Sequence, residues 1–346
     1  MPTVPAPLLS FLLLLLLVIM SAFASKIPHK FRWQQTMLRI KDPARSVRFY
    51  EDNFAFKLLH KYDFPEWKFS LYFMGILPSG AGPPAAPGSK AAEDFLWGDH
   101  SGVTLELTHN WGTEEDDSFK INNGNVEPFR GFGHIAVYCN DVYKCCEQLE
   151  NNGVSFQKRP DEGRMKGLAF ALDPDGYWIE VIRRNDASSI RETGPEYTLS
   201  QTMIRVKDPV KSLRFYRDLL GMTLLEEKHF SDFSLYFLAN VKEGSDRSSM
   251  FEPVIELTHN HGTESNESFS YHNGNDEDIP NGKLRGFGHV GFLTDDLDGA
   301  CAALETEGVV FKKRPTEGNM RGLAFVYDPD GYSVEIIKTN GLSLVK

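Results

Sequence analysis

The stretch that decides the fold begins with Gly131-Phe132-Gly133-His134 and ends with Asp173-Pro174-Asp175-Gly176-Tyr177-Trp178-Ile179-Glu180. A second copy begins with Gly286-Phe287-Gly288-His289 and ends with Asp328-Pro329-Asp330-Gly331-Tyr332-Ser333-Val334-Glu335. In each copy, a His at the front and a Glu at the back lie 46 residues apart. Because imidazole and carboxylate groups both bind metal ions, each copy is predicted to supply half of a metal site.

The rest of the chain repeats in the same order, which indicates a duplication. Motifs that start at residues 35, 69 and 105 return at residues 201, 233 and 255. The first copy carries 14 more residues between Phe73 and Leu105, including a Pro-, Gly- and Ala-rich segment (78–88) that is predicted to be a surface loop. The predicted organisation is an apolar segment (1–25), a first domain (31–185), a linker (186–197) and a second domain (198–340).

Each half divides again into two units with the order β-α-β-β-β. Asp42-Pro43 is typical of a helix start, with Asp as the cap and Pro in the first turn. In the first half, strands are predicted at 37–40, 56–62, 69–76, 103–107, 134–139, 154–157, 168–172 and 177–182, and helices at 42–53 and 141–151. Four such units predict an α+β fold with mixed or antiparallel sheets that curl around a site.

Bulk composition limits the function classes. The 346 residues carry a net charge of −11, which argues against non-specific nucleic-acid binding, because that needs a basic surface. Four cysteines (Cys139, Cys145, Cys146 and Cys301) lack zinc-finger spacing. They are predicted to be reduced structural thiols, typical of a cytosol-like compartment.

The N-terminus conflicts with that compartment. Residues 8–20 are almost wholly apolar, and Ala22-Phe23-Ala24 follows like a cleavage site, so the segment resembles a signal peptide without its basic start. Residues 4–24 are also long enough to anchor the protein in a membrane. A wrongly placed start codon is the third interpretation, and the sequence does not decide among them.

Eight side chains at matching places in the four units are the candidate metal ligands. The first strand of each unit carries Gln35, His134, Gln201 or His289, and the last strand carries Glu106, Glu180, Glu256 or Glu335. A Glu between two aliphatic residues normally faces solvent. Its recurrence in all four units indicates instead a concave face on which the carboxylate meets a cation.

The type of ligand narrows the choice of ion. A set of one imidazole and three oxygen donors suits zinc, nickel, cobalt or manganese, and the chemistry alone does not choose among them. His109 and His259 also recur, but they lie three residues beyond the Glu, on the opposite strand face. They are predicted to be structural.

Basic and amide side chains recur near these ligands: Arg39, Asn110, Arg130, Lys158 and Arg164 in the first half, and Arg205, Asn260, Arg285 and Lys313 in the second. Surface Arg and Lys residues are usually only solvated. Their recurrence beside the candidate ligands of an acidic protein indicates a pocket for a ligand that bears carboxylates.

These motifs resemble glyoxalase I (lactoylglutathione lyase), a family of the vicinal oxygen chelate superfamily, in the two-domain monomeric form of fungi. The resemblance covers about residues 33 to 340 and both halves. The matching segments of the first half are 34–39, 69–73, 105–112, 130–134, 165–170 and 173–180.

The resemblance implies a zinc-dependent reaction, with nickel, cobalt or manganese as other possible ions. The hemithioacetal of methylglyoxal and glutathione would be isomerised to S-D-lactoylglutathione through a metal-stabilised ene-diolate, with Glu180 and Glu335 as bases. It also implies mixed sites, one with Gln35, Glu106, His289 and Glu335, and the other with Gln201, Glu256, His134 and Glu180. A chain that completes both sites is expected to be a monomer, and glutathione chemistry is expected in the cytoplasm.

The resemblance further implies which residues contact the substrate. They are Arg39, Asn110, Arg285, Lys313 and Met320 at one site, and Arg205, Asn260, Arg130, Lys158, Arg164 and Met165 at the other. Asn319 replaces Arg164 in the second copy, and two residues are missing before Phe233, so the two sites are expected to differ. The alternatives are another metal enzyme of the superfamily or a small-molecule-binding protein of the same fold. An iron dioxygenase would need two His and one Glu, and the two Gln residues argue against it.

Overall fold

The computed structural model describes residues 27, 29–184, 196–247, 250–275, 284–339 and 343–344. The predicted apolar segment (1–25) and nearly all of the predicted linker (186–195) lie outside the described residues. Within the described ranges, no helix is long and apolar enough to cross a membrane. The interpretations of the N-terminal segment and the domain boundaries therefore stay predictions.

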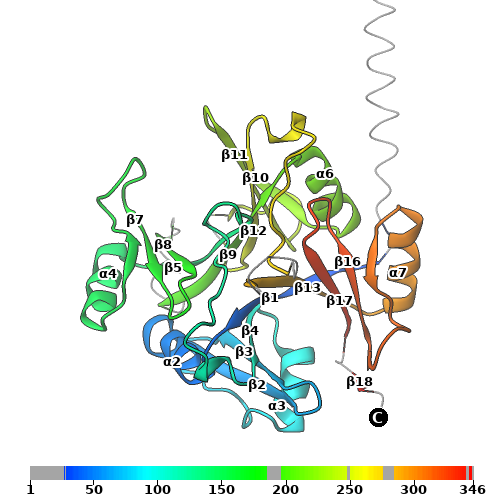
Figure 1. Cartoon of the computed structure of the whole chain (residues 1–346), viewed down its shortest axis with the longest axis horizontal. Helices are drawn as coiled ribbons and strands as arrows, with labels where there is room; N and C mark the ends of the chain where they lie inside the picture. Colours follow the sequence, from blue (N-terminus) through cyan, green and yellow to red (C-terminus); the bar gives the residue numbers. More distant parts are fainter. Residues whose placement is uncertain are drawn as a thin grey trace, which may run out of the picture.

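Two eight-stranded sheets of mixed strand direction form most of the fold (Figure 1). From edge to edge, the first sheet contains β14 (Phe311–Lys313), β16 (Leu323–Tyr327), β17 (Ser333–Lys338), β13 (Phe287–Thr294), β1 (Arg32–Ile40), β4 (Thr104–Asn110), β3 (Phe69–Ile76) and β2 (Phe56–Phe64). The second contains β10 (Thr223–His229), β11 (Phe233–Ala239), β12 (Val254–Asn260), β9 (Tyr197–Val206), β5 (Phe132–Cys139), β8 (Trp178–Arg183), β7 (Leu168–Leu172) and β6 (Phe156–Lys158). A short antiparallel pair, β15 (Met320–Arg321) with β18 (Ser343–Leu344), lies outside both sheets. The predicted α+β class is confirmed.

Each sheet takes one unit from each half of the chain. β1 of the first unit pairs antiparallel with β13 of the fourth unit, and these two strands lie side by side in Figure 1. In the same way, β5 of the second unit pairs with β9 of the third. Side chains that are far apart in sequence therefore face one another on neighbouring central strands.

The helices begin where the capping residues predict. Asp42 accepts hydrogen bonds from the backbone N–H groups of Ala44 and Arg45, and Pro43 occupies the first turn. The α-helices are α2 (Pro43–Phe54), α3 (Lys90–Asp94), α4 (Val142–Asn151), α6 (Pro209–Leu213) and α7 (Leu297–Thr306). The helical turns are η1 (Phe95–Asp99), η2 (Thr113–Glu115), η3 (Arg214–Leu219) and η5 (Thr263–Ser265). Helix α3 and the π-helical η1 follow the predicted surface loop and were not predicted from the sequence.

The Asp-Pro-Asp-Gly-Tyr motif clamps neighbouring units together. Asp173 accepts hydrogen bonds from the N–H groups of Asp175 and Tyr177 through Oδ1, and from the Tyr50 hydroxyl through Oδ2. Tyr177 in turn donates its hydroxyl proton to the carbonyl of Arg39. The second copy makes the same bonds at the matching positions Asp328, Tyr216, Tyr332 and Arg205. The motif therefore joins the first unit to the second and the third to the fourth.

The glycines of the Gly-Phe-Gly-His motif are needed for close approach of other atoms. A Cβ at Gly131 would overlap the carbonyl oxygen of His272, and one at Gly133 would overlap the side chain of Met203. Neither glycine has a positive φ, so close packing, and not a left-handed backbone conformation, accounts for both. Beside them, Phe132 and Phe287 stack with ring centroids 5.2 Å apart, which brings the starts of β5 and β13 together.

The four cysteines are buried and form no disulfide bond with one another.

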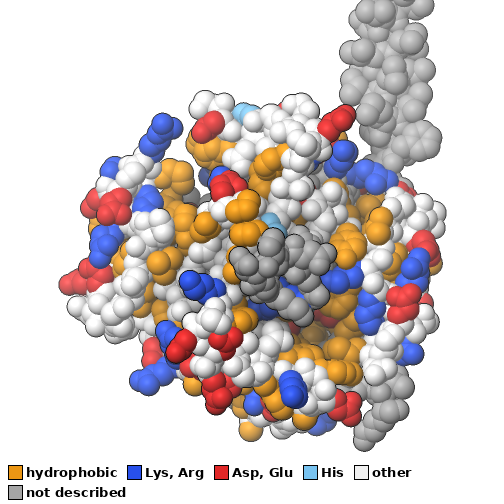
Figure 2. Space-filling model, in the orientation of Figure 1, with side chains coloured by type: hydrophobic (Ala, Val, Ile, Leu, Met, Phe, Trp, Pro, Cys, Tyr) orange, Lys and Arg blue, Asp and Glu red, His pale blue; other side chains and the backbone are white. Residues whose placement is uncertain are grey.

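On the face in Figure 2, basic and acidic side chains are interspersed around the periphery, so neither sign of charge dominates that face despite the net charge of −11.

Candidate metal centres and their cavities

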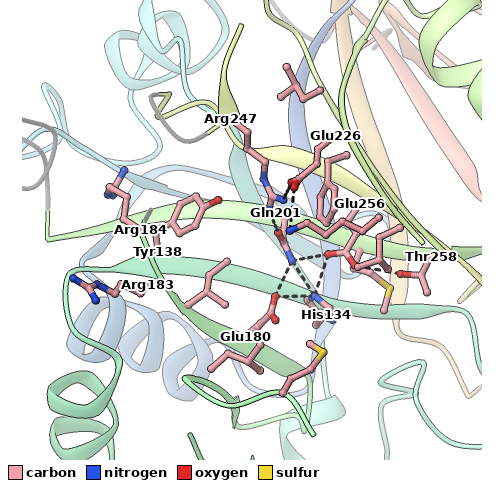
Figure 3. A pocket seen from close by; sticks show the side chains of 18 of the residues that line it. His134, Tyr138, Glu180, Arg183, Arg184, Gln201, Glu226, Arg247, Glu256 and Thr258 are labelled. Atoms are coloured by element: carbon pink, nitrogen blue, oxygen red, sulfur yellow. Dashed lines mark hydrogen bonds and ion pairs between the residues drawn. The ribbon is translucent and has the colours of Figure 1, made fainter. Parts of the chain in front are cut away.

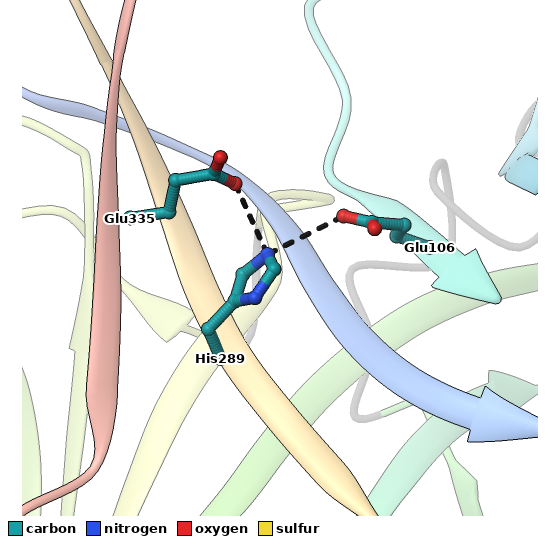
Figure 4. A group of neighbouring side chains, drawn as sticks. All are labelled: Glu106, His289 and Glu335. Atoms are coloured by element: carbon teal, nitrogen blue, oxygen red, sulfur yellow. Dashed lines mark ion pairs between the residues drawn. The ribbon is translucent and has the colours of Figure 1, made fainter. Parts of the chain in front are cut away.

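The first centre is formed by Gln35, Glu106, His289 and Glu335, one from each of the adjacent strands β1, β4, β13 and β17. His289 Nε2 lies 3.3 Å from Glu106 Oε2 and 3.1 Å from Glu335 Oε2 (Figure 4). Gln35 Nε2 donates to the same two oxygens at 2.5 Å and 2.9 Å. The structure thus brings together two residues from each half of the chain.

The second centre is formed by Gln201, Glu256, His134 and Glu180, on the adjacent strands β9, β12, β5 and β8. His134 Nε2 lies 3.3 Å from Glu180 Oε2 and 3.8 Å from Glu256 Oε2. Gln201 Nε2 donates to these oxygens at 2.7 Å and 2.6 Å. These side chains point toward one another in Figure 3, and both groupings are those that the family resemblance implied.

Burial makes the charged side chains of both centres unfavourable unless a partner of opposite charge lies beside them. The four glutamates are between 3% and 6% exposed, although carboxylates are almost never buried without a partner. Burial disfavours a charged imidazole, but hydrogen bonds and charge from Glu180 and Glu256 outweigh it and raise the pKa of His134 to about 9. Glu335 and Glu106 likewise raise the pKa of His289 to about 9 against the effect of burial. Burial, with the charge of Glu106, raises the pKa of Glu335 despite the opposing effect of His289.

The donor set fits a divalent cation. In each centre the His nitrogen and the two carboxylate oxygens lie within 4.8 Å of one another. Gln35 Oε1 has no hydrogen-bond partner among the described residues, whereas its Nε2 faces two carboxylate oxygens and lies 3.1 Å from His289 Nε2. A half-turn of this amide group would place its oxygen, a fourth ligand atom, at the centre. The four side chains could then hold an ion in a mixed nitrogen and oxygen shell.

The recurrent histidines outside the centres have a different role. His109 Nε2 lies 2.7 Å from Glu114 Oε2, and His259 Nε2 lies 2.8 Å from Glu264 Oε2. In the described part of the chain, neither histidine joins a group that could hold a metal ion. Their geometry agrees with the structural role predicted for them.

Each centre lies in the wall of a cavity. The cavity at the first centre has a volume of about 260 Å³, and that at the second about 730 Å³. Of the predicted substrate-contacting residues, Arg39, Asn110, Arg285 and Met320 line the first cavity, and Arg205 and Met165 line the second. Lys313, Asn260, Arg130, Lys158 and Arg164 are not among the lining residues of either.

Four of the predicted substrate-contacting residues already form hydrogen bonds within the protein. Arg39 donates to Asn275 Oδ1 at 2.8 Å and to the carbonyls of Gly286 and Phe287, and its counterpart Arg205 makes the matching bonds to Asn125 and residues 131–132. Lys313 and Lys158 donate to backbone carbonyls of their own loops. The two arginines therefore brace the Gly-Phe-Gly-His strands as well as lining the cavities.

The sequence reasoning missed two residues beside the centres, Trp97 in the first cavity and Arg247 in the second. Each lies nine residues before the glutamate of its centre, Glu106 or Glu256. An alignment of the two halves at the spacing of these glutamates would have paired them. Trp97 was hidden by the longer loop that precedes it.

Comparison with known proteins agrees with this architecture. The family profile described as Glyoxalase/Bleomycin resistance protein/Dioxygenase superfamily matches the chain twice, over residues 32–181 and 198–336. Glyoxalase I of Saccharomyces cerevisiae is 44% identical over 314 residues, which cover 87% of this chain and 90% of the yeast protein. A lactoylglutathione lyase of Schizosaccharomyces pombe is 40% identical over 312 residues, which cover 89% and 96% of the two chains.

A solved structure shows the same likeness in three dimensions. The crystal structure of glyoxalase I from Zea mays is 27% identical and superposes with a TM-score of 0.64, over 90% of this chain and 93% of that one. The chain therefore belongs to the glyoxalase superfamily, in the glyoxalase I (lactoylglutathione lyase) family, and it carries both repeats in one polypeptide.

Proposed function

We propose that this protein is a lactoylglutathione lyase that isomerises the hemithioacetal of methylglyoxal and glutathione to S-D-lactoylglutathione. The observation that carries the proposal is the pair of buried centres, each with two carboxylates, one imidazole and one amide on four adjacent strands. Each centre opens into a cavity that is also lined by arginine side chains. The identity with glyoxalase I over most of the chain supports the same reaction.

The reaction moves a proton between adjacent carbons. The C–H bond of the carbon that carries sulfur breaks, a C–H bond forms at the neighbouring carbon, and the hydroxyl and carbonyl groups exchange places. Glu335 and Glu180 are the proposed bases, because the family resemblance implies this role for them, and each carboxylate faces the middle of its centre. A divalent cation held by the four side chains would polarise both substrate oxygens and stabilise the charge of the ene-diolate.

The arginines beside the centres suit the glutathione part of the substrate, which carries carboxylates. We propose that Arg39, Asn110 and Arg285 at the first centre and Arg205 at the second, which line the cavities, bind these carboxylates, and that Met320 and Met165 contact other parts of the substrate. The family resemblance implies the carboxylate-binding role also for residues that do not line the cavities: Lys313 at the first centre, and Asn260, Arg130, Lys158 and Arg164 at the second. Arg39 lies two residues beyond Met37, the register partner of Glu106, so its guanidinium is displaced along the sheet from the ligands. The carboxylates of the substrate would therefore bind away from the reacting carbons.

Zinc is the proposed ion, with nickel, cobalt or manganese as alternatives for the same donor set. We propose a monomer, because both centres are completed by strands of one chain. The proposed location is the cytoplasm, where glutathione chemistry is expected, and the alternatives are the secretory pathway or a membrane anchor through residues 4–24. Imaging a fluorescent fusion with and without residues 1–25 distinguishes these locations.

The direct test follows the rise in thioester absorbance when methylglyoxal and glutathione are added to the purified protein. Glu335→Gln and Glu180→Gln are each expected to abolish turnover at one centre, and the double variant is expected to be inactive. Glu114→Gln, a glutamate outside both centres, is the matched control and keeps wild-type activity. Wild-type turnover in the double variant would refute the proposal.

A further inference from the structure

Three side chains differ in chemical character between the two centres although they occupy matching places. In the first half, His60 pairs in register with Phe73 and Tyr62 pairs with Leu71. In the second half, Glu226 pairs with Phe237 and Lys228 with Leu235, which are the copies of Phe73 and Leu71. Trp97 and Arg247 complete the two sets at the same distance before the glutamates of the centres.

The first set, His60, Tyr62 and Trp97, is aromatic and tightly packed. Trp97 is 1% exposed and meets the Phe73 ring edge-on at 5.4 Å. Its indole N–H donates to the Tyr62 hydroxyl at 2.8 Å. His60 packs against Tyr62 with ring centroids 4.3 Å apart, and burial lowers the pKa of its imidazole. Of this set, Trp97 lines the first cavity beside Phe73 and Leu71, so the wall there is bulky and apolar, whereas the Tyr62 hydroxyl behind it donates to Glu93 Oε1 at 2.7 Å.

The second set, Glu226, Lys228 and Arg247, is ionic. Arg247 lies over the Phe237 ring at 3.8 Å, where Trp97 meets Phe73 in the first half. Its Nη1 lies 2.9 Å from Glu226 Oε2, and Lys228 Nζ lies 3.1 Å from Glu226 Oε1. Two cations share the carboxylate of Glu226, but the Lys228 side chain is 46% exposed, so solvent screens its charge as it screens that of Asp246, which is exposed and also lines this cavity. Arg247, whose side chain is only 16% exposed, is therefore the cation that a bound group in this cavity would meet with least screening.

The ionic set reaches the centre itself. Arg247 Nη2 donates to Gln201 Oε1 at 2.9 Å, and Figure 3 shows Arg247 and Glu226 next to Gln201. Phe237 pairs in register with Glu256, as Phe73 does with Glu106. Trp97 in the first cavity and the ionic set in the second therefore lie beside the ligands in the cavity walls. The Arg247 side chain is only 16% exposed, and its Nε has no hydrogen-bond partner among the described residues.

We propose that the two centres divide the substrates by the side chain of the 2-oxoaldehyde. This inference rests on the proposed function. The second centre accepts hemithioacetals whose 2-oxoaldehyde part carries a carboxylate, with Arg247 and Lys228 as specificity residues. Its larger cavity, about 730 Å³ against about 260 Å³, gives that group room. The first centre prefers an apolar or aromatic side chain, which packs on Trp97 and Phe73. The isomerisation is the same at both centres, so no other reactant is needed.

Single-centre proteins test the proposal. Glu335→Gln leaves only the second centre active, and Glu180→Gln leaves only the first. Each is assayed with the glutathione hemithioacetals of methylglyoxal, phenylglyoxal and 4,5-dioxopentanoate, the last of which carries a carboxylate. The ratio of kcat/KM for 4,5-dioxopentanoate to that for phenylglyoxal cancels the glutathione contribution. We expect this ratio to be at least about tenfold higher in the second-centre protein, the effect of one charge-assisted hydrogen bond.

Exchanging Trp97 and Arg247 between the two centres should exchange their substrate preference. Arg247→Trp in the second-centre protein is expected to lower the ratio about tenfold, and Arg247→Lys is expected to retain most of it. Trp97→Arg in the first-centre protein is expected to raise the ratio. Turnover of the methylglyoxal substrate reports whether each variant still folds and reacts. Equal ratios in the two single-centre proteins, or no change with Arg247→Trp, would overturn the inference while the proposed function stands. Absence of methylglyoxal turnover in both single-centre proteins would overturn the two together.

Discussion

Replacing Tyr50 with Phe tests the clamp that joins the first two units. The Tyr50 ring is fully buried, and its hydroxyl donates to Asp173 Oδ2 at 3.0 Å. Phe fills the same space, so the change removes one hydrogen bond without opening a cavity. A buried acceptor that loses its partner costs about 1–3 kcal/mol. We expect the free energy of unfolding to fall by that amount.

The loss of stability caused by Tyr50→Phe should depend on pH. Burial, with the charge of Asp175, raises the pKa of Asp173 to about 7, against about 4 in an unfolded chain. Since the folded pKa is the higher one, the contribution of this carboxyl to stability is complete below about pH 4 and is lost as the pH rises through about 7. The protonated carboxyl also tolerates the missing donor better than the anion does. The penalty of Tyr50→Phe is therefore expected to be larger at about pH 9 than at about pH 5.

The assay is urea unfolding followed by circular dichroism and fluorescence at the two pH values. Tyr216→Phe removes the matching bond to Asp328 Oδ2, also 3.0 Å long, and should cost the same. Tyr143→Phe is the control, because this tyrosine is 54% exposed and bonds to an exposed aspartate; its effect should stay within about 0.5 kcal/mol. A loss for Tyr50→Phe no larger than that control, or a penalty that shrinks at high pH, would refute the reasoning.

Three further outcomes are expected. Dialysis against a chelator should abolish activity and lower the thermal midpoint, because buried carboxylates lose their cation; an unchanged midpoint in calorimetry would contradict this. His109→Gln should cost about 1 kcal/mol of stability with no change in metal content by elemental analysis, and loss of an ion would make His109 a ligand. In the Glu180→Gln protein, Arg39→Met should raise the KM for the methylglyoxal hemithioacetal about tenfold, with a smaller change in kcat; an unchanged KM would limit Arg39 to bracing Gly286 and Phe287.

Local sequence signals predicted the elements whose causes are local. The Asp42-Pro43 cap placed the start of α2, and the strand predicted at 69–76 agrees with β3 as observed. β1 was predicted to start at Met37 but begins at Arg32. The additional residues pair with β13, where Arg32 lies opposite Leu293. That partner is more than 250 residues away, so no local pattern could show it.

The ligands of the metal centres could be predicted from the sequence, but their grouping into two centres could not. Recurrence of His and Glu identified the candidate ligands, but the pairing of Glu106 with Glu335 came from the resemblance alone. Alternation along a strand cannot show that β1 lies beside β13 rather than β5. The hydrogen bond of Arg247 to Gln201 could not be predicted for the same reason, because it depends on the three-dimensional path of the loop after β11. The sequence could show only that Trp97 and Arg247 occupy corresponding positions.

The central claim is that each centre draws its ligands from both halves of the chain, and metal content in two double variants tests it most directly. Glu106→Gln with Glu335→Gln alters two ligands of the first centre, whereas Glu106→Gln with Glu180→Gln alters one ligand in each centre. We predict about one tightly bound ion per chain in the first variant, with the second centre still active, and none in the other variant. No bound ion in the first variant and about one in the other would contradict the account, because it would mean that each half builds a centre by itself.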